Sequence, residues 1–166
     1  MADKKFPFKI KQKVVYPSQG VGVINSIIER ELNGEKVPYF VIHLDVTEMT
    51  IMTPVDKAEA LGIRAVVPAE EAMKALEFIG EAFEPNPSDW KLRYQMNMEL
   101  LKKGTVMDIA SIVRSLYHRS KVKELPIMER KLYDSAKKLF EDELSFALKK
   151  SKTEIDTLIH KRLENK

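Results

Sequence analysis

The spacing of apolar residues changes near residue 68, and this change constrains the fold more than any other feature of the chain. Before it, from Lys11 to Thr53, β-branched residues and turn signals succeed one another, which is typical of short antiparallel strands. After it, apolar residues recur three and four positions apart, as in amphipathic helices. We therefore expect an α+β protein with two domains, a β domain over residues 1–67 and an all-α helical domain over residues 68–166.

The pair Asn33-Gly34 is the strongest local signal in the β domain. It supplies the positive φ angles that a two-residue type I′ hairpin turn requires, so it predicts a long hairpin. Together with its neighbours, this hairpin predicts a small, strongly bent sheet or barrel. The expected strands are Lys13–Tyr16, Val21–Leu32, Lys36–Leu44 and Met49–Thr53, followed by a short helix over Val55–Leu61 that Gly62 stops.

Five helices are expected in the second domain. Proline and acidic residues open the first, over residues 68–83, and residues 84–89 (EPNPSD) break the chain after it. Ser88 or Asp89 can cap the second helix, which Gly104 ends. The third helix follows Thr105, the fourth runs from Pro126 to about Lys149, and Ser151 and Glu154 form a plausible capping box for the last.

The composition excludes several classes of protein. The chain of 166 residues has no cysteine, so it can hold neither a disulfide nor a thiolate zinc site. Its start lacks the apolar core of a signal peptide, and no stretch is apolar enough to span a membrane, so we expect a cytoplasmic protein. The net charge of only +3 hides a basic tract over residues 91–138, where twelve cationic side chains face five anionic ones. Such a tract is typical of proteins that bind a phosphate backbone, although a solvated helical face has the same composition.

Trp90, the only tryptophan, lies at the start of the second helix, immediately before this basic tract. A ring of this size is usually buried, so composition alone favours a core residue. The alternative is a ring presented to a partner, with Lys91 and Arg93 beside it.

The sequence contains no recognisable catalytic motif. The three histidines, His43, His118 and His160, are far apart, and none is spaced for a shared metal on a helix. "GVGVIN", from Gly20, lacks the third glycine of a dinucleotide fingerprint and leads into a strand, so the first glycine more plausibly serves a tight turn. We expect neither an enzyme nor a cofactor.

The segments "VVYPSQGVGVI", "MTIMTP", "LGIRAVV" and "PSDWKLRY" occur in an order that resembles the CarD/CdnL family of bacterial RNA polymerase-binding regulators. The resemblance covers nearly the whole chain. It implies a Tudor-like β-barrel that docks on the β subunit of RNA polymerase and a helical domain that touches promoter DNA. It also implies a cytoplasmic, nucleoid-associated protein, and we expect it to act as a monomer.

The resemblance suggests residues for both partners. A family docking arginine matches Arg30, whereas a second falls on Met52; the sheet edge Thr50, Ile51 and Met52 could still pair main chain to main chain with the polymerase. For Arg30, a solvated strand charge is an equally good interpretation.

On the DNA side, the resemblance implies that Trp90 is a wedge in the minor groove at the upstream edge of the melted bubble. Family phosphate contacts match Arg93 and Arg130, and Lys91, Arg114 and Arg119 could add further contacts. Leu92 and Gln95 stand where some relatives have basic residues. The expected function is stabilisation of the promoter open complex without sequence recognition. The alternative is an adaptor between proteins, with Trp90 in the core.

Overall fold

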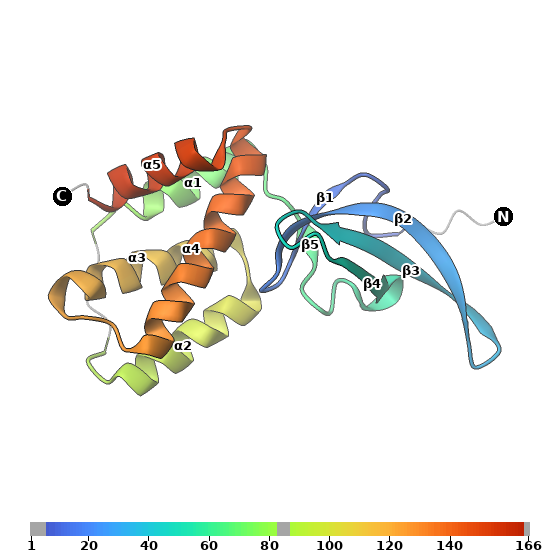
Figure 1. The fold of residues 1–166 in the computed structure, drawn as a ribbon, viewed down its shortest axis with the longest axis horizontal. Coiled ribbons are helices and arrows are strands. Elements are labelled where there is room, and N and C mark those ends of the chain that lie inside the picture. The colour runs from blue at the N-terminus through green and yellow to red at the C-terminus, as the bar shows by residue number, and fades with distance from the viewer. Residues whose placement is uncertain (1–5, 83–86, 165–166) are drawn as a thin grey trace. The chain divides into compact units, whose positions relative to one another are not determined.

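The computed structural model describes residues 6–82 and 87–164, and the chain divides into two compact units, Met1–Val66 and Val67–Lys166. The first unit holds the strands and the second the helices (Figure 1). The predicted α+β fold class is therefore confirmed. Residues 84–86 of the predicted chain break lie outside the described residues. The same holds for Phe83, at the end of the first predicted helix, and for residues 1–5.

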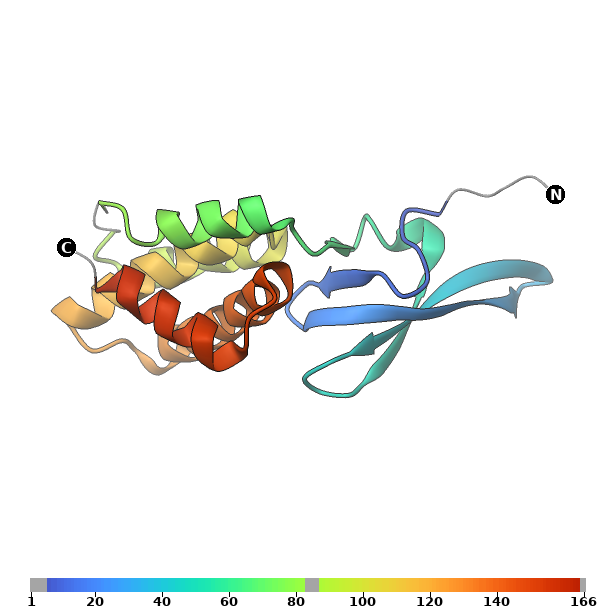
Figure 2. The same ribbon diagram turned by 90° about the horizontal axis from the view of Figure 1, so that it is seen from above.

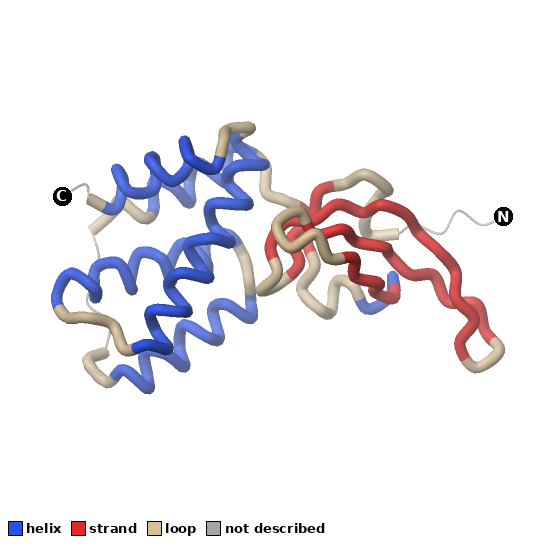
Figure 3. Tube along the Cα trace, viewed as in Figure 1, coloured by secondary structure: helices blue, strands red, loops and turns tan. Residues whose placement is uncertain are grey.

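The strands, red in Figure 3, form one antiparallel sheet. Their order is β4-β3-β2-β1-β5, so β4 and β5 are the two edges of the sheet. Its core face carries alternate residues of the long strands, such as Phe40, Ile42 and Leu44. The strands are β1 (Lys13–Tyr16), β2 (Gly20–Leu32), β3 (Glu35–Leu44), β4 (Thr50–Pro54) and β5 (Arg64–Ala65). The sequence did not predict β5, because a strand of two residues has no periodicity.

Positive φ angles define two turns of this unit. Asn33 (φ 52°) and Gly34 (φ 82°) connect β2 to β3, as expected of a type I′ turn. Gly20 (φ 102°) makes the turn into β2, which confirms the interpretation of that glycine. The predicted helix after β4 is only a 3-10 turn, η1 (Val55–Lys57), and Gly62 (φ 87°) lies in the turn that follows.

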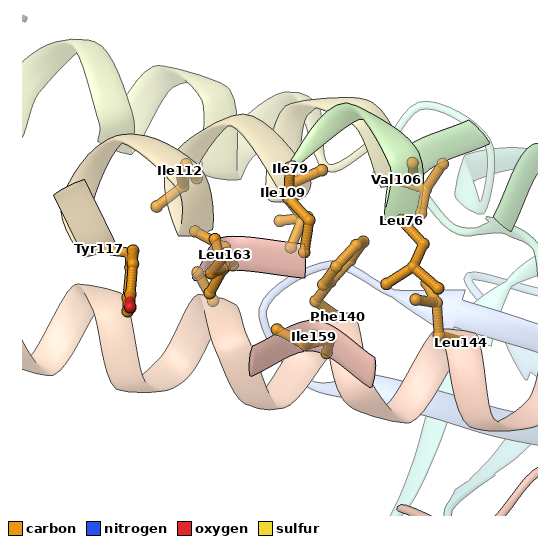
Figure 4. Packing of buried hydrophobic residues seen from close by; sticks show 14 of the residues in the cluster. Leu76, Ile79, Val106, Ile109, Ile112, Tyr117, Phe140, Leu144, Ile159 and Leu163 are labelled. Carbon is orange, nitrogen blue, oxygen red and sulfur yellow. The ribbon is translucent and has the colours of Figure 1, made fainter. Parts of the chain in front are cut away.

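The helical unit buries one apolar cluster that four of its helices build, and the helix that begins at Trp90 packs partly buried side chains such as Tyr94 against it (Figure 4). Large members include Leu76 of α1, Ile112 of α3, Phe140 of α4 and Ile159 of α5. The helices are α1 (Ala69–Phe78), α2 (Trp90–Lys103), α3 (Val106–Val122), α4 (Ile127–Leu148) and α5 (Lys152–Leu163). Figure 2 views this unit from the side on which α1 and α5 lie, opposite α2 in Figure 1.

Side-chain caps explain where three of the helices begin. Asp89 accepts a hydrogen bond from the Lys91 amide, Thr105 from the Asp108 amide and Ser151 from the Glu154 amide. Gly104 (φ 70°) ends α2 in the left-handed conformation. The caps at Asp89 and Ser151 are ones that the sequence predicts, and Thr105 lies where the sequence places the start of the third helix.

A charged cluster joins α4 to α5. Lys137 Nζ lies 3.0 Å from Asp156 Oδ1 and 3.7 Å from Glu141 Oε1, and His160 Nδ1 lies 3.2 Å from Asp156 Oδ1. Burial and a hydrogen bond with Asp156 raise the pKa of Glu141 from 4.5 to about 7, whereas the same bond lowers the pKa of Asp156. The cluster therefore holds Glu141 largely protonated in mildly acidic solution.

Glu141→Gln should make the helical unit more stable in alkaline solution. A raised carboxyl pKa means that the folded state prefers the protonated form, so Glu141 contributes stability below about pH 4.5 that is lost as the pH rises through about 7. Glutamine keeps a neutral group at every pH. We expect a gain of about 1 kcal/mol at pH 8, discounted for partial exposure, and little change at pH 4. Urea unfolding at both values checks this, and an equal effect at both would contradict it.

Candidate functional sites

Trp90 begins α2 and keeps 37% of its surface exposed, so it is not sealed in the bundle. The Asp89 cap fixes the first turn of the helix beneath it, since Asp89 Oδ1 accepts from the Lys91 amide at 3.1 Å. Lys91 is itself exposed. The arrangement therefore presents an indole and a cation at one helix start.

Arg93 does not point to solvent, and its predicted role as a phosphate contact is wrong. It is only 2% exposed, and its guanidinium donates to both carboxylate oxygens of Glu129, at 2.7 and 2.5 Å. Nη1 also donates to the carbonyls of Pro87 (2.9 Å) and Ser88 (3.3 Å). A guanidinium with these partners has no free edge for a phosphate. Arg93 instead fixes the segment that leads into Trp90.

Glu129 is a residue of this candidate site that sequence reasoning missed. It is fully buried in the first turn of α4, and its bond to Arg93 joins the start of α2 to the start of α4. The partners are 36 positions apart, so no helical spacing signals the pair. Arg130, the next residue, is exposed and remains a candidate phosphate contact.

The two predicted arginines of α3 do not share a face. Arg114 lies over the Phe78 ring (3.9 Å to its centre) and donates to the Phe78 carbonyl at 3.4 Å, so it packs on the end of α1. Arg119 is five positions further, a turn of about 140° around the helix. His118 lies between the two arginines in the sequence. Its burial and the nearby charge of Arg114 both lower the pKa of its ring, so the ring adds no charge at neutral pH. We therefore correct the prediction for Arg114 and keep Arg119, which is half-buried, as a candidate.

Strand register places the predicted polymerase contacts in the β unit. Met52 pairs with Val41 and Arg30 pairs with Val37, and these β3 residues are four apart, so both side chains lie on the sheet face opposite Phe40. Thr50 pairs with His43 and joins the same face. Val37 and Val41, the β3 partners of Arg30 and Met52, are about 13 Å apart along the strand.

Ile51 differs from its neighbours. It pairs with Ile42 and packs against the core cluster, so its side chain faces inward. Its predicted contact can involve only the main chain. Because β4 is an edge of the sheet, that main chain is available on one side.

The described residues contain no group of three or more histidine, aspartate or glutamate side chains placed to hold a metal ion. His43 lies on β3, His118 on α3 and His160 on α5. Within the same residues, no helix combines the length and apolarity needed to cross a membrane.

Comparisons with known proteins identify the family. Residues 8–67 match the description "CarD-like/TRCF RID domain", and residues 74–160 match "CarD, C-terminal domain". YdeB of Bacillus subtilis (strain 168), whose name gives it as a candidate transcription factor, is 36% identical over 141 residues, or 82% of this chain and 90% of YdeB. The solution structure of the N-terminal domain of Myxococcus xanthus CarD is 27% identical and covers 38% of this chain and 84% of that domain, with a TM-score of 0.31. The chain therefore belongs to the CarD family of transcription factors.

Proposed function

We propose that this transcription regulator docks on the β subunit of RNA polymerase through its β unit and stabilises the promoter open complex through its helical unit. The observation that carries the proposal is Trp90, an exposed indole at a helix start held by a buried ion pair. The protein acts as a monomer, and its association with the nucleoid follows from the polymerase.

The DNA contact is a stacking contact supported by charge. Trp90 can stack on base steps at the upstream edge of the bubble, where pyrimidine–purine steps part readily. Stacking of one base on an aromatic ring contributes about 1–3 kcal/mol and tolerates any sequence. Lys91 and Arg130, both exposed and each within two positions of a residue of the ion pair, supply phosphate contacts. Such contacts give no operator specificity.

The polymerase contact is an edge-strand contact. β4 can add to a strand of the polymerase, with affinity from main-chain hydrogen bonds and support from Arg30 and Met52 on one face. The β subunit as the partner comes from the family resemblance. Docking raises the local concentration of the helical unit at the promoter, so weak DNA binding suffices.

Met52→Arg should strengthen docking, because it places a cation where family members carry one. We expect polymerase affinity to rise about fivefold, as for one exposed ion pair of about 1 kcal/mol. Arg30→Glu should lower affinity by a similar factor. Binding of the full chain to polymerase, measured at two salt concentrations, checks both predictions. Equal affinities of the wild type and the two variants would show that charged side chains at these positions do not contribute to docking.

Stabilisation of the open complex follows from differential binding. A ligand shifts an equilibrium only by its preference for one state, and parted base steps exist only after melting. The test is the lifetime of polymerase–promoter open complexes after challenge with a competitor, with and without the protein. A longer lifetime supports the proposal. An unchanged lifetime, with polymerase binding intact, would instead favour an adaptor that joins polymerase to another protein.

A further inference from the structure

Two exposed apolar side chains open α4. Ile127 is 75% exposed and Met128 is 50% exposed. Neither belongs to the apolar cluster of the helical unit. Exposed apolar side chains gathered into one patch mark interaction sites, whereas single scattered ones are normal.

The buried ion pair ties these side chains to Trp90. Glu129, directly after Met128, binds Arg93, one turn after Trp90, so the first turns of α2 and α4 are held next to each other (Figure 1). Side chains in a first turn lean toward the helix N-terminus. We call the set Trp90, Ile127 and Met128 the helix tip.

Exposed cations outnumber exposed carboxylates in the segments that carry the helix tip. Within four positions of its residues along the chain lie two exposed carboxylates, Asp89 and Glu124, of which Asp89 caps α2, against four exposed cations: Lys91, Lys123, Arg130 and Lys131. An apolar centre with a cationic rim is complementary to a surface that is itself apolar in the middle and anionic at the edges. Nucleic acid with partly unstacked bases has this character, since phosphates flank the groove on both sides.

We infer that Ile127 and Met128 make a second apolar contact with promoter DNA, in the minor groove beside the step that Trp90 enters. The inference rests on the proposed function and extends it from one wedge to a two-helix wedge. Isoleucine and methionine are among the side chains that minor-groove proteins place between base steps.

An acidic amphipathic helix of a protein partner is the competing occupant. Such a helix docks along a groove and needs anchors over several turns. Ile127 and Met128 occupy a single turn of α4, at its end. This geometry suits insertion between base steps better than a helix lying along a groove.

The test compares open-complex lifetimes for the full chain with Ile127→Ala and Met128→Ala combined, with Trp90→Ala, and with a matched control. The control, Met73→Ala with Met107→Ala, removes two exposed apolar side chains of the same unit from α1 and α3. We expect the α4 double variant to shorten the lifetime about fivefold. The control should match the wild type. Alanine favours helix, and thermal unfolding verifies that each variant is folded.

A second measurement, polymerase binding without promoter, separates the outcomes. The inference is supported if the α4 double variant shortens the lifetime and keeps its polymerase affinity. A wild-type lifetime for this variant, when Trp90→Ala shortens it, overturns the inference and leaves the proposed function standing. Loss of polymerase affinity also overturns it, because the helix tip would then dock on protein. If Trp90→Ala has no effect either, both proposals fail.

Discussion

Glu129→Ala is expected to destabilise the helical unit by about 3–5 kcal/mol, because it leaves the Arg93 guanidinium buried without its carboxylate. The remaining acceptors, the carbonyls of Pro87 and Ser88, carry no full charge. A loss of this size is a large part of the stability of an ordinary domain. Trp90 is the only tryptophan and lies in the helical unit, so its fluorescence during urea unfolding reports this unit alone.

Two variants control this prediction. Glu124→Ala removes an exposed carboxylate just before α4 and should change stability by less than about 0.5 kcal/mol. Arg93→Met combined with Glu129→Met removes both charges and should recover most of the loss, since apolar pairs of similar volume replace buried ion pairs well. A loss below about 1 kcal/mol for Glu129→Ala would mean that water reaches the guanidinium.

Local signals predicted most of the fold. Asn33-Gly34, Gly104 and the capping residues act through their own backbone or through neighbours within a few positions, so the sequence shows them directly. β5 and the length of η1 could not be predicted in the same way. β5 exists because it pairs with β1, about fifty positions away in the chain, and such pairing leaves no local pattern.

The sequence predicts the position of a candidate site residue where a single helix or strand determines it. The exposed Trp90 and Lys91 belong to the first turn of α2, and Thr50 and Met52 belong to one strand. Arg93 was misassigned because its role depends on Glu129, and Arg114 because its role depends on Phe78. A cation in a basic tract looks the same in sequence whether it faces a phosphate or a buried carboxylate.

Trp90→Ala should shorten the open-complex lifetime about tenfold, which corresponds to a loss of about 1.4 kcal/mol of preference for the open state. This value lies within the range of about 1–3 kcal/mol for stacking of one base on an aromatic ring. Polymerase affinity should not change, because the proposed docking edge lies in the other unit. Competitor challenge of preformed open complexes measures the lifetime. An unchanged lifetime would count against the wedge.

Partial burial of Trp90 requires a control that separates lost stacking from a loosened helix. Trp90→Phe keeps an aromatic ring, so it should retain part of the lifetime, whereas Trp90→Leu, which keeps an apolar side chain without a ring, should not. Lys91→Ala tests the charge: it should lower the slope of log affinity against log salt by about 0.9, and Trp90→Ala should leave that slope unchanged. Equal open-complex lifetimes for Trp90→Leu and Trp90→Phe would show that an apolar side chain at the start of α2 is sufficient and that stacking does not contribute.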